Sequence, residues 1–290
     1  MNLASLKTFL AILETGSLAR ASARLHVGQS TVTARLQRLE QEIGQSLFHR
    51  SKSGVMLTAS GLKFKRYAEA MTDLWQQARQ EASMPAGISA VFNLGCDHDL
   101  WSVFGLRLLG RIHREQPQTA LSAWPGKHDE LDQWLATGLV DAALTHLPIL
   151  RDGITQHELY DENLVLVSTE PDSPIRFDPG YIYVDAGGDF GRRHAAAYAD
   201  AGIARVSFGC SSWALDFLLE RGGSAYLPET IAEPWCDTGQ LFRLPQAPTF
   251  SRKTYLVTSD AVAGSWPWLA PIVEWLRSVP TAAKAAGSAG

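Results

Sequence analysis

Polar side chains that can hydrogen-bond to nucleic acid crowd a short stretch near the N-terminus. They comprise amide, hydroxyl, guanidinium, imidazole and ammonium groups: Gln29, Ser30, Thr31, Thr33, Arg35, Arg38, His49, Arg50 and Lys52. Short hydroxyl and amide side chains at the start of a helix suit base edges in the major groove, and arginine suits guanine or phosphate. The spacing predicts a surface that reads DNA, whereas the plainer interpretation is a polar helix face that only contacts solvent.

A second set of chemically capable residues is spread over four later segments. It contains thiol, carboxylate, imidazole, indole, ammonium and hydroxyl groups: Cys96, Asp97, His98, Trp101, Lys127, Thr145, His146, Ser211, Ser212 and Trp213. Each segment follows an expected strand or opens an expected helix, and ligands of open α/β sheets bind beyond the carboxyl ends of the strands. A helix beginning near Ser211 can hold a carboxylate through its N–H groups, while indole and imidazole rings suit an aromatic or cationic body. The set predicts a site for a small metabolite and leaves the charge of that ligand open.

Simpler structural roles compete for several members of the second set. Asp97 and its neighbour Asp99 are both suited to capping a helix over residues 100–115, and Ser211 or Ser212 is suited to capping a later one. Trp213 could equally belong to a hydrophobic core.

Metal and redox chemistry receive less support from the spacing. Cys96, Asp97 and His98 are metal-ligand types, but no second pair follows at i+3 or i+4 and no structural zinc spacing occurs, so neither a metal site nor a cofactor is predicted. The chain has three cysteines. A redox-responsive protein that uses Cys96, Cys210 and Cys236 is an alternative if folding joins these cysteines.

The apolar pattern of the first 58 residues predicts the elements that present the first set. Apolar residues recur at helical spacing up to Thr15-Gly16, and further helices are expected over residues 17–25 and 29–43 around a break at His26-Val27-Gly28. Residues 47–58 alternate around Ser-Lys-Ser-Gly and predict a hairpin with a basic tip. This arrangement would leave the polar face of the third helix exposed.

A long helix is expected next, over residues 59–83. Its apolar stripe includes Tyr67, Met71 and Trp75, and a small neighbouring domain cannot cover so long a stripe. The stripe therefore predicts pairing with the same helix of a second copy. Met84-Pro85-Ala86-Gly87 then marks the best domain boundary in the chain.

Composition and charge narrow the class of protein. A chain of 290 residues with 46% hydrophobic and 19% charged residues is globular rather than disordered, and two or three domains are expected. Residues 1–66 carry ten Lys and Arg against three acids, a net charge of +7, whereas the remainder carries 16 against 27, a net charge of −11. The basic end is suited to a polyanion. No apolar run reaches the roughly 18 residues of a membrane span, no secretory signal pattern occurs, and cysteines are few, so a cytoplasmic protein without membrane contact is predicted.

From residue 88 onward, strand-like and helix-like patterns alternate. Strands are expected at 91–96, 119–124, 140–145, 162–169, 181–185, 204–208, 224–228 and 254–259, and helices at 100–115, 128–138, 189–200, 212–221 and 266–278. The alternation predicts a mostly parallel sheet covered on both faces. Two α/β lobes fit the pattern better than one, and the small-residue segment 281–290 is expected to be a disordered tail.

The stretch FLAILETGSLARASARLHVGQSTVTARLQRLEQEIGQSLFHRSKSGVMLTASG, residues 9–61, resembles the winged helix-turn-helix of LysR-type transcriptional regulators. It matches the Phe, Gly-Ser, Ala, Leu, Gln, Leu-Glu, Gly, Leu-Phe, Arg and Leu-Thr-Gly positions of that family. The motif is long and specific. The linker helix and the two-lobed remainder are similar to the family in layout across nearly the whole chain.

This resemblance implies an α/β fold class with three parts. They are a winged helix-turn-helix DNA-binding domain over residues 1–58, a long linker and dimerisation helix over 59–87, and a two-lobed α/β effector-binding domain over 88–280 that resembles periplasmic binding proteins. Lobe I would take residues 88–163 and 264–280, and lobe II residues 164–263. The second set of residues would then line a ligand cleft between the lobes.

The resemblance also implies a function and partners. The protein is expected to be a sequence-specific transcriptional regulator and not an enzyme, with its activity modulated by a small-molecule effector. It would bind an interrupted palindrome in double-stranded promoter DNA as a dimer joined through helix 59–83, or as a tetramer, with RNA polymerase a further partner to consider. An enzyme or solute-binding protein with an accessory basic domain is the contrasting hypothesis.

Three positions depart from the family pattern. Gly28 and Ser30 stand where the family more often has Ser or Thr and Pro, and Ser22 stands where it often has Ala. Glycine is still an acceptable helix cap, so Gly28 should leave the fold intact while removing a hydroxyl that could contact phosphate. The bases that the third helix reads are therefore not fixed by the resemblance.

Overall fold

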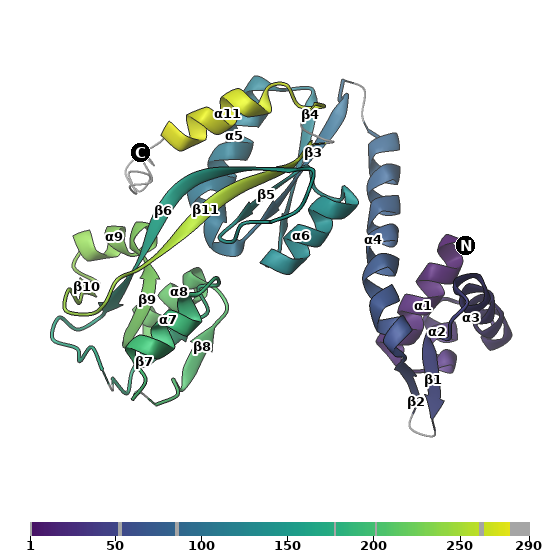
Figure 1. The fold of residues 1–290 in the computed structure, drawn as a ribbon, viewed down its shortest axis with the longest axis horizontal. Helices are drawn as coiled ribbons and strands as arrows, with labels where there is room; N and C mark the ends of the chain where they lie inside the picture. The colour runs from purple at the N-terminus through teal and green to yellow at the C-terminus, as the bar shows by residue number, and fades with distance from the viewer. Residues whose placement is uncertain are drawn as a thin grey trace. The chain divides into compact units, whose positions relative to one another are not determined.

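The computed structural model describes residues 2–51, 54–84, 87–176, 178–200, 202–260 and 264–278, apart from the side chains of residues 50, 51, 80 and 81. The chain forms two compact units that divide after Ala86 (Figure 1). None of the described helices is long and apolar enough to cross a membrane. The tail expected over 281–290 lies outside the described residues.

The N-terminal unit is a helical cluster with a two-stranded hairpin. Helix α1 is central to it, because α2, α3, α4 and β2 all contact this helix. The elements are α1 (Leu3–Thr15), α2 (Leu18–Arg24), α3 (Gln29–Ile43), β1 (Phe48–Ser51), β2 (Gly54–Leu57) and α4 (Ala59–Ala82). The predicted order of helix, helix, turn, helix and hairpin is thus present.

Local signals set the ends of these helices. The Asn2 side chain accepts the Ser5 N–H at 2.8 Å where α1 begins, and Gly16 ends α1 with a φ of 63°. Ser17 caps α2 by accepting the Arg20 N–H. His26 takes a φ of 53° in the turn before α3, a left-handed conformation that redirects the chain within a few residues.

The apolar stripes of the first three helices meet in one core. Phe9, Val32 and Leu39 are fully buried there, and Leu36 is nearly so. All of the buried residues of α3 belong to this core, so the rest of the helix surface faces away from it.

Two contacts fix the hairpin against the helices. The Glu40 carboxylate of α3 accepts the backbone N–H of Leu47 at 2.7 Å, which anchors the chain just before β1. Gly61 lies so close to Leu47 that a Cβ added to Gly61 would stand 2.0 Å from the Leu47 carbonyl oxygen. Only glycine permits this approach of α4 to the hairpin.

The C-terminal unit is built on one mixed sheet with the strand order β4-β3-β5-β11-β6-β9-β7-β8, to which β10 adds beside β6. The strands are β3 (Ala90–Cys96), β4 (Thr119–Pro125), β5 (Ala142–Thr145), β6 (Ile154–Ser168), β7 (Tyr181–Val184), β8 (Val206–Phe208), β9 (Ser224–Pro228), β10 (Phe242–Arg243) and β11 (Phe250–Ser259). Strands β6 and β11 are long, antiparallel partners that run from one lobe into the other (Figure 1).

Helices pack on the sheet in two groups, which define the lobes. Lobe I contains β3, β4 and β5 with α5 (Leu106–Glu115), α6 (His128–Thr137) and α11 (Leu269–Ser278), and lobe II contains β7, β8 and β9 with α7 (Phe190–Ala197), α8 (Ser211–Arg221) and α9 (Glu229–Asp237). Each lobe has its own buried clusters, around Phe92 and Ile112 in lobe I and around Val184 and Tyr226 in lobe II. The predicted two-lobed α/β architecture is confirmed. The prediction of a mostly parallel sheet is wrong, because the long strands β6 and β11 pair antiparallel with each other and with β9 and β5.

Three local features differ from the sequence predictions. The helix expected over 100–115 begins instead with a 3₁₀ turn (His98–Leu100) and a π-helical turn (Trp101–Gly105) before α5. Strand β6 is longer than the expected 162–169, because it also pairs with β11 in lobe I. Helix α9 was not predicted, and it contains Pro234, a residue type that is uncommon inside helices.

Candidate nucleic-acid interface and interlobe cleft

The helix-turn-helix leaves the polar residues of α3 accessible. Gln29, Ser30, Thr31 and Arg38 are exposed, and Thr33 and Arg35 are half-buried. These six residues are the α3 part of the predicted DNA-reading set, and they occupy the first two and a half turns of the helix.

Two of these side chains are already engaged within the helix. The Thr33 hydroxyl donates to the Gln29 carbonyl at 3.0 Å, and Arg38 pairs with Glu42 at 3.3 Å. Arg35 makes no hydrogen bond or ion pair with the residues that the structure describes. Its guanidinium is therefore the most available cation of the helix for phosphate or guanine.

The hairpin supplies the remaining predicted DNA contacts. His49 is exposed on β1, where it pairs with Met56 of β2. The side chain of Arg50 and the whole of Lys52 lie outside the described residues, so their predicted roles stay predictions.

The long helix α4 carries an uncovered apolar stripe. Tyr67, Met71, Leu74 and Trp75 are between 36% and 50% exposed, and they follow one another at helical spacing along one face. Exposure on this scale is unusual for large apolar side chains that share a face.

A cleft of about 240 Å³ lies between the two lobes, and four predicted effector residues line it. These are Asp97, Lys127, Thr145 and His146. Side chains and backbone that were not predicted complete the wall: Asp99, His128, Asp129, Leu147, Asp185, Ala186, Gly187, Gly188, Gly209 and Arg252. The four predicted residues all come from the ends of lobe I strands or the loops that follow them, as the rule for open α/β sheets requires.

The start of α8 is occupied by a carboxylate of the chain itself. Asp99 of lobe I accepts the Ser211 backbone N–H at 2.8 Å and the Ser211 hydroxyl at 2.7 Å. Both residues are buried, with Ser211 fully inaccessible. The anion expected at this helix start is therefore Asp99 rather than a ligand, and the contact ties lobe I to lobe II.

Arg252 of β11 extends this link between the lobes. Its guanidinium contacts Glu162 of β6 at 2.6 Å, Asp99 at 3.4 Å and the Ala186 carbonyl at 2.6 Å. Asp99 and Arg252 lie 153 positions apart in the chain, which is why no local pattern could join them.

Burial dominates the electrostatics of the cleft. It raises the pKa of Asp97 to about 6, with the neighbouring Asp99 charge acting in the same direction. Burial also raises the pKa of Glu162, although the Arg252 charge opposes the shift. For His146, burial and then the charge of Arg252 lower the pKa well below its ordinary value. His146 is consequently a neutral imidazole at pH 7.

Six predicted effector residues lie elsewhere than the cleft wall. Cys96 belongs to the core of lobe I, and Asp97 caps the turn in which His98 lies by accepting the Asp99 N–H. His98 and Trp213 face each other with ring centroids 6.0 Å apart, and Trp213 is 60% exposed rather than a core residue. Trp101, Ser211 and Ser212 likewise do not line the cleft.

The three cysteines are poorly placed for thiolate chemistry. Cys96 and Cys210 are buried, and Cys236 is half-buried. Burial raises the pKa of the Cys96 and Cys236 thiols, which lowers the fraction of reactive thiolate.

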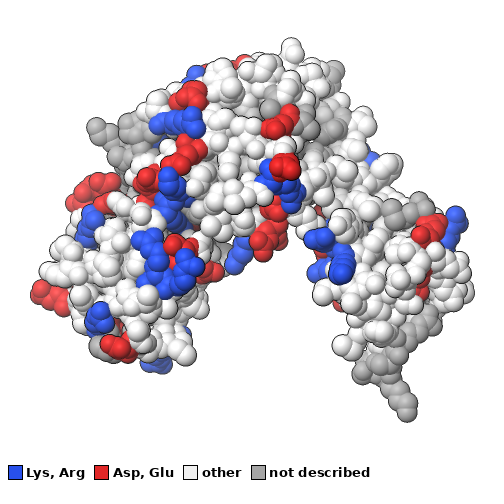
Figure 2. All heavy atoms as spheres, viewed as in Figure 1, with Lys and Arg blue, Asp and Glu red and all other residues white. Residues whose placement is uncertain are grey.

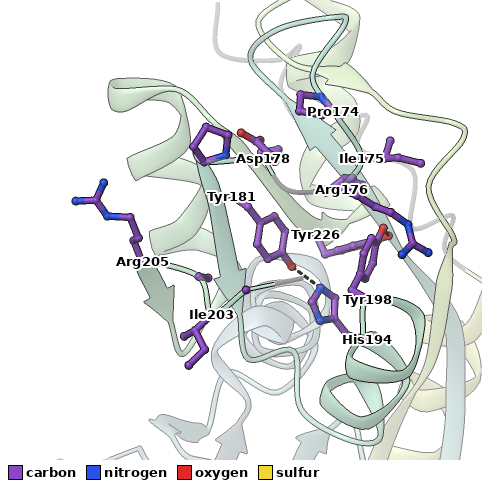
Figure 3. Close-up of a pocket in the computed structure, with 15 residues that line it drawn as sticks. Pro174, Ile175, Arg176, Asp178, Tyr181, His194, Tyr198, Ile203, Arg205 and Tyr226 are labelled. Carbon is purple, nitrogen blue, oxygen red and sulfur yellow. Dashed lines mark hydrogen bonds between the residues drawn. The ribbon is translucent and has the colours of Figure 1, made fainter. Parts of the chain in front are cut away.

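A second cavity of about 330 Å³ lies wholly within lobe II and was not predicted (Figure 3). Its walls include the rings of Tyr181, His194, Tyr198 and Tyr226, and the Tyr181 hydroxyl contacts His194 Nε2 at 2.7 Å. These rings come from β7, from α7 and the residue that follows it, and from β9, so only the tertiary fold brings them together.

Family comparisons define a two-domain transcriptional regulator. The model of the bacterial regulatory helix-turn-helix protein, lysR family, matches residues 3–62, and that of the LysR substrate binding domain matches residues 85–265. These matches span most of the chain. The protein therefore belongs to the LysR family of DNA-binding transcriptional regulators, as the resemblance of residues 9–61 predicted.

Individual relatives agree with this assignment. The HTH-type transcriptional regulator HdfR of Escherichia coli O17:K52:H18 is 28% identical over 255 residues, which are 87% of this chain and 90% of HdfR. The LysR family regulator CbnR has a TM-score of 0.68 at 19% identity, with 96% of this chain and 99% of CbnR covered. Full-length LysG of Corynebacterium glutamicum with bound effector Arg has a TM-score of 0.54 at 19% identity, with 96% and 98% covered. The two solved structures establish the fold.

Proposed function

We propose that this regulator reads promoter DNA with the exposed residues of α3 and contacts the flanking backbone with the β1–β2 hairpin. The single observation that carries the proposal is that the helix-turn-helix core buries Val32, Leu36 and Leu39 and leaves Arg35 without a partner among the described residues. Residues 1–66 carry a net charge of +7, which supports contact with a polyanion.

The test begins with selection of an operator from a random duplex library by the full-length protein. Fluorescence anisotropy then measures affinity for the selected operator and for a scrambled duplex across a salt series. A regulator loses affinity steeply with salt yet keeps a preference of about a thousandfold or more for its operator. Weak association that depends little on salt and not at all on sequence would instead favour a solute-binding protein with an accessory basic domain.

The active species is a homodimer joined through α4. The stripe of Tyr67, Met71, Leu74 and Trp75 supports this, since two copies of the stripe would cover each other as a paired helical seam. Sedimentation equilibrium should show dimers or larger assemblies for the wild type and a marked shift to monomers for Met71→Asp with Trp75→Asp. The matched control is Leu62→Asp, which places the same charge at another exposed apolar residue of α4 outside the stripe.

The interlobe cleft binds the small-molecule effector. Its support is the convergence of Lys127, Thr145, Asp185 and Arg252 from both lobes on one cavity. A ligand that contacts both lobes favours one relative arrangement of them, and that preference is what can alter DNA binding.

Thermal unfolding against a metabolite panel sorted by charge and aromaticity tests the cleft. A ligand at a hundredfold its Kd adds about 2.7 kcal/mol to the stability of the unit that binds it, or roughly 5–11 °C for a unit of this size. Lys127→Ala and Asp185→Asn should reduce the shift, whereas Trp213→Ala, outside the cleft, should preserve it. A shift that survives both cleft variants would place the effector elsewhere.

A further inference from the structure

The floor of the interlobe cleft, by which we mean Asp97, Asp99, Arg252 and the Glu162 that contacts Arg252, holds more acidic than basic groups. Asp99 and Glu162 contact the Arg252 guanidinium, and the Arg252 charge also acts on the nearby Asp97 carboxylate. The exposed fractions of the Asp99, Glu162 and Arg252 side chains are 5%, 4% and 7%, so water screens these charges poorly. With all four groups ionised, the floor carries a net charge of −2.

Beside these carboxylates lies the imidazole of His146, which makes no hydrogen bond with the part of the chain that the structure describes. Neither Nδ1 nor Nε2 of His146 has a hydrogen-bond partner among the described residues, although the residue is only 7% exposed. A buried polar side chain without partners is costly to the fold, because it has lost its contacts with water and gained none in return. His146 lines the cleft, so a ligand there is in position to supply the missing partner.

The three residues lie close enough to share one ion. Asp97, Asp99 and His146 each offer a ligand atom, and these atoms are all within 4.8 Å of one another. Asp97 and Asp99 come from the turn after β3, and His146 follows β5, the strand that pairs with β3. The sequence showed no ligand spacing because the strand pairing, not the local chain, brings His146 to the aspartates.

We propose that a divalent metal ion binds to Asp97, Asp99 and His146 at the floor of the effector cleft. The proposal deepens the proposed function, because it names the class of ligand that the cleft senses. A divalent ion would balance the net charge of −2 on the floor, whereas a monovalent ammonium group would leave one charge uncompensated.

The surroundings of Asp99 are those of a ligating carboxylate. Both of its oxygens are oriented by hydrogen bonds, from the Ser211 N–H and hydroxyl, and Arg252 lies within 3.4 Å. Carboxylates that bind metals are commonly held by such outer contacts. Arg252 is itself held by Glu162 of β6 and by the Ala186 carbonyl.

Two carboxylates with one imidazole suit a first-row divalent ion such as Mn²⁺ or Zn²⁺ better than a thiolate-seeking ion. Binding would also affect the contact between the lobes. Asp99, one ligand of the ion, is the residue of lobe I that accepts a hydrogen bond from Ser211 at the start of α8. Metal occupancy and lobe arrangement are thereby coupled.

The experiment measures Mn²⁺ binding to the full-length protein after chelator treatment and desalting, by following the paramagnetic resonance signal of free Mn²⁺. One ion per chain is expected, in competition with Zn²⁺. His146→Gln and Asp97→Asn should each weaken the affinity about tenfold or more. His146→Gln removes no hydrogen bond to the described residues, and Asp97→Asn retains an oxygen for the Asp99 N–H, so both variants should fold.

Asp129→Asn is the matched control, since it removes an exposed acidic charge from the cleft wall without removing a ligand. It should change the Mn²⁺ affinity by about threefold or less. Equal weakening by all three variants, or no Mn²⁺ and no Zn²⁺ binding to the wild type, overturns the metal site. A thermal shift with putrescine or arginine but with neither metal also overturns it and leaves the proposed effector cleft standing.

Discussion

The contact between Asp99 and Ser211 should be a measurable part of the stability of the C-terminal unit. Ser211→Ala removes the 2.7 Å hydrogen bond from the hydroxyl to a buried carboxylate and keeps the bond from the Ser211 backbone N–H. A hydrogen bond to a charged group contributes about 1.5–3 kcal/mol. For a unit of this size the expected loss corresponds to a fall in Tm of roughly 3–12 °C.

Tryptophan fluorescence of the full-length protein is a suitable readout, because eight of the nine tryptophans follow residue 87. The matched control is Ser212→Ala, whose half-buried hydroxyl hydrogen-bonds, among the described residues, only with the Cys210 thiol, at 3.6 Å. That variant should stay within about 0.5 kcal/mol of the wild type. If the Ser211→Ala and Ser212→Ala variants unfold at the same temperature, the hydrogen bond between the Ser211 hydroxyl and Asp99 contributes less to the stability of the C-terminal unit than expected here.

Two further predictions concern the packing of α4 and the response to pH. Gly61→Ala should cost about 1–3 kcal/mol because its Cβ meets the Leu47 carbonyl. Gly110→Ala, in helix α5, should be neutral or stabilising, because its Cβ would meet only the end of the flexible Arg114 side chain, at 3.9 Å. Urea unfolding of both variants distinguishes them. Burial lowers the pKa of His194. The unfolded chain therefore binds more protons near the ordinary histidine pKa of about 6.5, and stability should fall as pH drops from 7.5 to 5.5. His194→Gln should reduce that fall, and an unchanged pH profile would contradict the assignment.

The helices of the N-terminal unit could be predicted because their signals are local. Ser17 caps α2, and Gly16 and Gly44 end α1 and α3. The spacing of the apolar residues in α3 indicates which face of that helix is buried. Each of these signals acts within a few residues, so one sequence suffices to read it. The resemblance to the family motif then indicated that the exposed face of α3 binds DNA, a point that the spacing alone left open.

The cleft was predictable only in part, for the opposite reason. Asp97, Thr145 and His146 follow strands, and the strand-end rule found them. Arg252 lies inside strand β11, not at a strand end that follows a local pattern, and gains its role from Asp99 and Glu162, which are 153 and 90 positions away. No periodicity or motif encodes a contact at that separation.

Charge patterning was informative about one unit and not about the other. The basic excess of residues 1–66 is a property of the sequence and needs no structure. In the C-terminal unit, acidic and basic side chains alternate across the visible face (Figure 2), so the sum of −11 says little about the cleft. The electrostatics of the cleft depend instead on which carboxylates the fold buries close to one another.

The most direct test of the account compares Thr33→Ala and Arg35→Ala with the wild type on the selected operator and on a scrambled duplex. Arg35→Ala should weaken binding to the operator, and Thr33→Ala should chiefly lower the ratio of operator to scrambled affinity, by an amount equivalent to about 1–3 kcal/mol. These results would assign DNA reading to α3. Equal losses for both variants on both duplexes would contradict the claim that α3 distinguishes one sequence from another.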